Sequence, residues 1–152
     1  MSGILSGNSN IVWKYKDKEI EKIEDLPEGT FGFVYCTTHL PSDKKYIGKK
    51  SLIYNQKKKL GKKEKALWEG KGCPPIFKRV QKESDWKTYF GSHSYIKESP
   101  PYFLKREILE VAFNKKHLTY LECKHQFKLG VLENSQYLND NILGKFYDRD
   151  FK

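Results

Sequence analysis

The chain has 152 residues, of which 38% are hydrophobic and 32% charged, and its formal net charge at pH 7 is +10. This length suits one domain with a sizeable core. No apolar run reaches the length of a membrane span, which excludes a protein embedded in a bilayer. A basic chain with 14% aromatic residues favours a polyanionic partner, with nucleic acid as the first candidate and an anionic membrane surface as the second.

The cysteines and the amino-terminal segment indicate a protein of a reducing compartment. Cys36, Cys73 and Cys123 are odd in number and far apart, and they lack the spacing of a zinc finger. Residues 1–10 are small and polar, without the charged and apolar regions of an export signal, and we expect them to be flexible. We therefore expect a cytoplasmic protein with one domain over residues 11–152.

A short accessory hairpin is predicted for the first ordered part of the chain. Residues 11–23 carry a β-rich run, a polar turn and a second short run, with Trp13 and Tyr15 on one face. We expect this hairpin to cover an edge of the domain. Pro27 and Gly29 then interrupt regular structure before the next hairpin begins.

The central hairpin is predicted at residues 32–50. Aromatic residues alternate along its first half, the Pro41-Ser42-Asp43 segment has turn chemistry, and an extended apolar pattern resumes after it. Tyr35 and Tyr46 then stand on neighbouring strands. Gly48 indicates a close backbone approach or the start of a helix.

Residues 49–71 are the most lysine-dense part of the chain. Clustered charges of one sign repel without a counter-charge, which favours a phosphate-contacting arm over an ordinary solvated surface. A local helix is possible here, interrupted at Gly61 and Gly70, and residues 76–80 predict a short strand. The residues expected to contact DNA are Lys49, Lys50, Lys57, Lys58, Lys59, Lys62, Lys63 and Arg79.

Two further segments carry recognisable patterns. In residues 85–92, Trp86 and Tyr89 are expected to be core anchors, and Ser92 is expected to cap a short helix. Residues 102–111 then predict a strand.

A helix is predicted from about residue 115 to 129, with Asn114 as its cap. Leu118 and Leu121 fall on one apolar stripe, and Glu122 borders it. A bare buried carboxylate is costly, so Glu122 is expected either at the rim of a groove or beside a cation.

These motifs together resemble the GIY-YIG nuclease family. Gly32-Phe33-Val34-Tyr35 resembles a relaxed first half-motif, and Tyr46-Ile47-Gly48 matches the second half-motif letter for letter. The Trp-x-x-Tyr-x-Gly-Ser segment that begins at Trp86 is similar to one in phage-encoded, free-standing homing-type endonucleases. The resemblance implies an α+β fold: a small three-stranded antiparallel sheet flanked by helices, with an N-terminal accessory hairpin and a basic insertion.

The resemblance also implies a metal-dependent endonuclease that hydrolyses phosphodiester bonds of double-stranded DNA. In that arrangement Glu122 holds Mg²⁺ or Mn²⁺, Tyr35 acts as the base, and Tyr46 is a positioning donor. Either Asn139 or Asn141 assists by polarising water or by holding a backbone turn. The implied location is the cytoplasm, that of an infected host cell if the protein is phage-encoded.

One element of the family pattern is absent, because no arginine occurs between Gly48 and Arg79. Lys57 or Lys58 would supply a point charge in its place, or Arg79 or Arg106 would substitute from another strand. The gap motivates an alternative, a nucleic-acid-binding protein on a nuclease scaffold with weak or no activity. Specificity is expected to come from the basic insertion, the accessory hairpin or a homodimer. A purely structural tyrosine hairpin is the third hypothesis.

Overall fold

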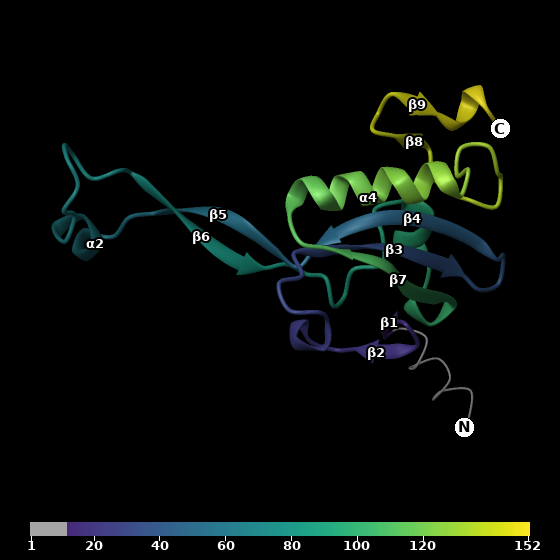
Figure 1. The fold of residues 1–152 in the computed structure, drawn as a ribbon, viewed down its shortest axis with the longest axis horizontal. Coiled ribbons are helices and arrows are strands. Elements are labelled where there is room, and N and C mark those ends of the chain that lie inside the picture. The colour runs from purple at the N-terminus through teal and green to yellow at the C-terminus, as the bar shows by residue number, and fades with distance from the viewer. Residues whose placement is uncertain (1–11) are drawn as a thin grey trace. The chain divides into compact units, whose positions relative to one another are not determined.

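The computed structural model describes residues 12–152, and a five-stranded sheet in the order β2-β1-β7-β3-β4 is its central feature (Figure 1). The strands are β1 (Trp13–Tyr15), β2 (Lys18–Ile20), β3 (Gly32–His39), β4 (Lys44–Ser51) and β7 (Leu104–Ala112). β3 pairs antiparallel with both β4 and β7, and β1 pairs parallel with β7. The α+β class is therefore confirmed, and the accessory hairpin extends the sheet. The predicted flexibility of residues 1–10 lies outside the described residues.

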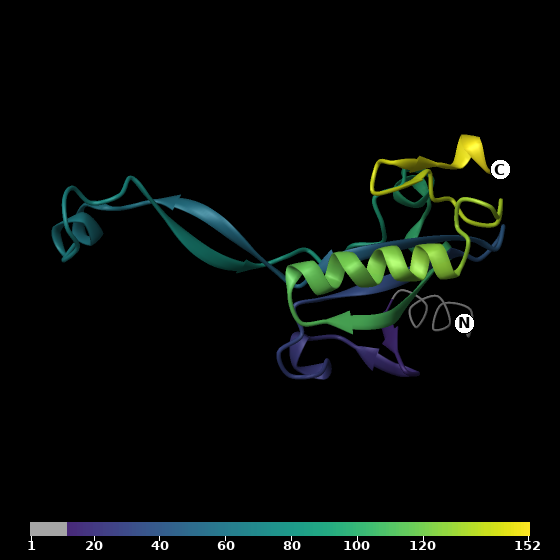
Figure 2. The same cartoon turned by 45° about the horizontal axis from the view of Figure 1, so that its top comes forward.

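Helix α4 lies along one face of β3, β4 and β7, as both ribbon views show (Figures 1 and 2). The cap is the predicted one, since Asn114 Oδ1 accepts a hydrogen bond from the His117 backbone N–H at 2.8 Å. The elements outside the sheet are η1 (Ile23–Asp25), α3 (Ser94–Glu98), η2 (Pro101–Phe103), α4 (Lys115–Lys128), β8 (Asn141–Ile142), β9 (Phe146–Tyr147) and η3 (Asp148–Asp150).

The two faces of the sheet carry different cores. On the α4 face, Val34, Cys36 and Ile47 from the strands pack against Leu118 and Leu121 of the helix. Successive strand residues point to opposite faces, so the residues between them point away from α4. The aliphatic cluster packs α4 against β3 and β4, and β4 is an edge strand of the sheet.

The other face is aromatic. The Trp13 ring lies 4.8 Å from that of Phe33 and 5.4 Å from that of Tyr35, in edge-to-face geometry. Trp13 Nε1 also donates a hydrogen bond to the Trp86 carbonyl at 2.7 Å. Both tryptophans are fully buried, so Trp86 is the predicted core anchor, and Trp13 makes the accessory hairpin part of the core as well as an edge.

Arg106 belongs to this aromatic core. Its guanidinium lies 4.4 Å from the Trp13 ring centroid and 4.0 Å from that of Phe90. Nη1 donates to the carbonyls of Lys87 at 3.0 Å and Tyr89 at 2.7 Å. Burial lowers the pKa of Arg106 to about 10, so the side chain keeps its charge at neutral pH. This stack holds the 85–90 segment on the sheet, and the expectation that Arg106 supplies the missing active-site arginine is wrong.

The described chain divides into two compact units, the second being Ile53–Ser84. It consists of β5 (Ile53–Lys59), α2 (Lys62–Ala66) and β6 (Phe77–Glu83), with β5 and β6 paired antiparallel. The local helix that the sequence allowed within residues 49–71 is present only as the short α2: β4 continues to Ser51, and β5 follows. In a helix, residues four apart such as Lys58 and Lys62 would face one another and repel, whereas a strand points successive lysines to opposite faces.

Candidate active site

The two half-motifs meet across the β3–β4 pair. Tyr35 stands directly opposite Gly48, and Thr37 opposite Tyr46. A Cβ atom on Gly48 would lie 2.6 Å from the Tyr35 hydroxyl oxygen and 3.0 Å from Tyr46 Cε2. Only glycine leaves room for both rings at this position, so the close backbone approach expected at Gly48 is present.

A polar cavity of about 450 Å³ lies beside this edge of the sheet. Side chains from β4, the 92–94 segment, α4 and the 139–144 segment surround it. Its polar lining includes Tyr46, Lys49, Ser92, His93, Glu122 and Asp140. Residues distant in sequence therefore meet around a space large enough for a phosphate group and its hydration.

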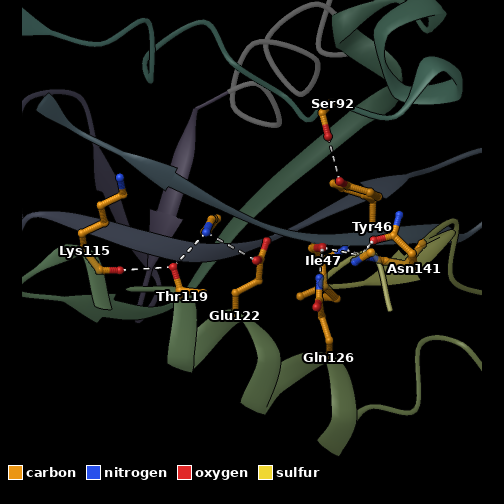
Figure 3. Close-up of polar contacts among 11 residues, drawn as sticks. Tyr46, Ile47, Ser92, Lys115, Thr119, Glu122, Gln126 and Asn141 are labelled. Carbon is orange, nitrogen blue, oxygen red and sulfur yellow. Dashed lines mark hydrogen bonds and ion pairs between the residues drawn. The ribbon is translucent and has the colours of Figure 1, made fainter. Parts of the chain in front are cut away.

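Glu122 reaches the cavity from α4, with 19% of its side chain exposed (Figure 3). Lys49 Nζ lies 3.9 Å from Glu122 Oε1 and donates a hydrogen bond to Thr119 Oγ1 at 2.9 Å. Burial raises the pKa of Glu122, and the positive charge of Lys49 opposes this rise. The carboxylate thus lies at the wall of a groove and also beside a cation, the two environments that periodicity left open.

Tyr46 presents its hydroxyl to the same cavity. The hydroxyl lies 2.8 Å from Ser92 Oγ, within hydrogen-bond distance (Figure 3). Burial raises the pKa of Tyr46, although the hydrogen bond with Ser92 opposes the rise. Tyr46 is therefore a neutral phenol at physiological pH, suited to donating or accepting a hydrogen bond.

Tyr35 has a different environment. It is 1% exposed and is not among the residues that line the cavity. Burial raises its pKa well above the ordinary value of 10.0, and the neighbouring Tyr89 raises it further. A tyrosine must be a phenolate to accept a proton as a base, and with this raised pKa Tyr35 stays a neutral phenol at neutral pH. Its environment therefore argues against the base role that the resemblance implied.

The two candidate asparagines have separate roles. Asn139 is 2% exposed, and its Oδ1 accepts from the Ile47 N–H at 3.0 Å while its Nδ2 donates to the Ile47 carbonyl at 2.8 Å. Gln126 of α4 donates to the same carbonyl at 3.2 Å. Asn141 Oδ1 accepts from the Gly144 N–H at 2.9 Å. Asn139 therefore holds the backbone of the second half-motif, and Asn141 closes an exposed turn.

Among residues 12–152, Lys49 is the one lysine that lines this cavity, and no arginine does. Lys50 instead lies 2.5 Å from Asp85 Oδ1 and over the Tyr89 ring, so its charge is already engaged. Lys57, Lys58 and the other exposed cations of the basic insertion belong to the second unit and are not part of the lining. The predicted DNA-contacting residues of this unit are Lys57, Lys58, Lys59, Lys62, Lys63 and Arg79.

Sequence patterns did not identify the titratable lining residues His93 and Asp140. His93, and not Ser92, caps α3, since its Nδ1 accepts from the Tyr95 N–H at 3.1 Å. Its Nε2 lies 3.6 Å from Asp140 Oδ2. Neither His93 nor Asp140 has a metal-ligand spacing in sequence, so only the fold brings them to the cavity.

The donor set fits a hard divalent cation. The described part of the chain contains no group of three or more His, Cys, Asp and Glu side chains placed so that they could hold a metal ion together. Magnesium, however, is usually held by one or two carboxylates and keeps several of its waters. Glu122, on the wall of a roomy polar cavity that Asp140 also lines, meets that requirement.

None of the described helices is long and apolar enough to cross a membrane.

Comparisons with known proteins agree with this geometry. Comparison with curated proteins and with solved structures gives no significant match. Residues 13–142, however, match the family model described as "Putative endonuclease segE, GIY-YIG domain", which covers the hairpin, the second unit and α4. The chain therefore belongs to the GIY-YIG endonuclease family.

Proposed function

We propose that this protein is a metal-dependent endonuclease that hydrolyses phosphodiester bonds of double-stranded DNA at the Glu122 cavity. The observation that carries the proposal is the meeting of Glu122, Tyr46 and Lys49 around one polar space beside Gly48. Membership of the family supports nuclease chemistry, and the net charge of +10 supports a polyanionic substrate.

Magnesium or manganese is the proposed cofactor, with Glu122 as its protein ligand. A divalent ion there would stabilise the charge that develops on the phosphate and on the leaving oxygen. The raised pKa of Glu122 reflects the cost of burying its negative charge. A cation would relieve that cost, so the carboxylate favours binding of a positive partner stronger than Lys49 alone.

The side chains of the cavity divide the remaining tasks. Water attacks phosphorus, the bond to the leaving sugar oxygen breaks, the attacking water loses a proton to solvent and the leaving oxygen gains one. Tyr46, held by Ser92, positions the water or a phosphate oxygen. Lys49 supplies the positive charge that the family's arginine would otherwise provide, as a point charge without a bidentate fork.

Positioning residues complete the proposal. Tyr35 fills the space left by Gly48 and thereby fixes the ring of Tyr46. Asn139 holds the strand between them through both polar groups of Ile47. We assign neither residue a proton-transfer step.

Nicking of supercoiled plasmid DNA tests the proposal. Wild-type protein with Mg²⁺ is expected to convert the plasmid to open-circular or linear DNA, and Glu122→Gln is expected to lose more than about 100-fold of this rate. Glu133→Gln is the matched control, because Glu133 is exposed and outside the cavity. Equal nicking by wild type and Glu122→Gln would refute the assignment.

A second candidate function is DNA binding on a nuclease scaffold that does not cut. The absence of an arginine from the lining, among the described residues, favours it. It predicts salt-sensitive binding of duplex DNA with no turnover at any Mg²⁺ or Mn²⁺ concentration. Plasmid nicking that requires Glu122 would exclude it.

The biological setting that we propose is a phage-encoded homing-type enzyme acting in the cytoplasm of an infected host. The match to the segE family model supports this setting. One cavity cuts one strand, so a double-strand cut would require a homodimer or two successive events. Sedimentation of the protein on duplex DNA, together with the ratio of nicked to linear product, distinguishes these routes.

A further inference from the structure

We propose that one face of the β5–β6 ribbon reads base pairs in the major groove of duplex DNA. The inference rests on the proposed function and names the recognition element for the same substrate. Asn55 stands opposite Gln81, and Lys57 opposite Arg79, in the antiparallel register. Residues two apart on a strand share a face, so all four side chains lie on one side of the ribbon.

This face is open. Asn55, Lys57, Arg79 and Gln81 are all exposed. On the opposite face, Lys78 is bonded to the Glu64 carboxylate and is only partly exposed. Tyr54, Gln56, Lys58 and Lys82 on that face are exposed as well, so exposure alone does not separate the two faces. The Asn55 face differs in its chemistry, because it carries Arg79 and two facing amides, whereas the other face carries Tyr54, Val80 and the Lys78–Glu64 pair.

The side-chain chemistry of this face matches the edges of base pairs. Arginine and lysine recognise guanine O6 and N7, and asparagine and glutamine recognise adenine N6 and N7. Lys57 and Arg79 are also like charges placed directly opposite each other, an arrangement that destabilises an isolated sheet. A bound polyanion removes that cost, which favours DNA over a neutral partner.

The face continues in both directions with residues of mixed character. Toward the strand ends near α2, Lys59 lies opposite Phe77 and adds one more positive charge. At the other end Ile53 lies opposite Glu83, the one acidic residue on this face. The positive charge is therefore concentrated on the half of the face that carries Lys57 and Arg79.

The dimensions of the ribbon select the groove. Two strands lie about 4.8 Å apart, and a two-stranded ribbon fits the major groove, which is about 12 Å wide, but not the minor groove, which is about 6 Å wide. The major groove of A-form RNA is too deep and narrow for side-chain readout. Positions 55 and 57 are about 7 Å apart along the strand, so the four side chains span about two base pairs.

Selection from a randomised duplex library tests the inference with the full-length chain. Binding is measured in EDTA, so that no cleavage occurs and the readout is independent of the Glu122 site. Wild type is expected to enrich a preference over about two to four base pairs. Asn55→Ala combined with Gln81→Ala is expected to weaken that preference about 10-fold or more, with an unchanged salt slope, because no phosphate-neutralising charge is lost.

Two further variants sharpen the result. Arg79→Lys keeps the charge but loses the bidentate fork, so it is expected to change the preference at one base pair. Gln56→Ala removes an amide from the opposite face and is expected to leave the preference unchanged. Retained non-specific DNA affinity and a wild-type melting temperature show that each variant is folded.

The outcomes separate this inference from the proposed function. An absence of sequence preference in wild type, an equal loss of affinity for every sequence in the Asn55/Gln81 variant, or tighter binding of duplex RNA would overturn the inference. A wild-type protein that binds with a preference yet never cuts in Mg²⁺ or Mn²⁺ would overturn the proposed function and leave the inference standing.

Discussion

The hydroxyl of Tyr35 lies against the backbone of Gly48, so close that a Cβ atom on the glycine would stand 2.6 Å from the phenol oxygen. The two residues face each other across the β3–β4 pair. The same missing side chain leaves space for the ring of Tyr46, whose Cε2 would lie 3.0 Å from that atom. The first half-motif and the second are thus joined by packing, and this packing positions the Tyr46 hydroxyl in the cavity.

Gly48→Ala is expected to destabilise the protein by about 1–3 kcal/mol, because the added methyl group overpacks a site where the buried Tyr35 ring has no room to move. The plasmid-nicking rate should fall by more than the loss of folded protein accounts for, since Tyr46 is displaced too. Denaturant unfolding and nicking rates measure the two effects. Gly61→Ala is the control, because its Cβ would meet only Glu64 Oε1, at 3.7 Å. Unchanged stability of Gly48→Ala would contradict the packing argument.

Asn139→Ala is expected to cost about 2–3 kcal/mol of unfolding free energy, because it removes both hydrogen bonds that the side chain makes to Ile47. Asn141→Ala should change stability by less than about 0.5 kcal/mol, since Asn141 is exposed and bonds only a surface turn. Urea unfolding of the two variants in parallel measures the difference. Equal losses from both would show that the Ile47 contact is not structural.

The sequence predicted the elements whose patterns are local. Alternation and turn residues identified the β3–β4 hairpin, and Asn114 marked the start of α4. The family resemblance brought Tyr46 and Glu122 together, which periodicity alone could not do, because their meeting depends on how α4 packs on β4.

The remaining features depend on tertiary contacts. The sequence left Arg106 as one possible substitute for the family's arginine, but it stacks between Trp13 and Phe90 after β1 pairs with β7. The lysines after Ser51 were interpreted as a helix or a loop, because strand pairing with β6, 18 or more residues further along the chain, leaves no local signal. The sequence predicted Lys49 only as one of several DNA-contacting residues, and the structure places it beside Glu122 in the cavity.

Lys49→Met is expected to lower the nicking rate by about 100-fold with little change in stability, because a charged donor facing the phosphate is lost from a partly exposed position. Lys50→Met should behave in the opposite way. It removes the contacts with Asp85 and the Tyr89 ring, at a cost of about 0.5–1 kcal/mol, and leaves nicking nearly unchanged. Single-turnover nicking rates and thermal unfolding of both variants distinguish the role of Lys49 in nicking from the role of Lys50 in stability. An equal effect of the two substitutions on the rate would remove Lys49 from its proposed role.

Glu122→Gln is expected to stabilise the metal-free protein at pH 7. Burial raises the pKa of Glu122, so the folded state binds this proton more tightly than the unfolded state. The favourable contribution is therefore complete below the ordinary value of 4.5 and is lost as the pH rises through the higher folded pKa. Glutamine does not titrate, and the stability gap between variant and wild type should close as the pH falls toward 4.5.

Denaturant unfolding in EDTA across this pH range measures the gap, with the exposed Glu133→Gln as the control that should show none. Added Mg²⁺ should then stabilise wild type and not Glu122→Gln, since a ligand that binds only the folded carboxylate shifts the folding equilibrium toward it. A variant less stable than wild type at pH 7 without metal would mean that attraction to Lys49, 3.9 Å away, outweighs the cost of burial. In that event the carboxylate would already be satisfied by the lysine, and the argument that it favours binding of a divalent cation would fail.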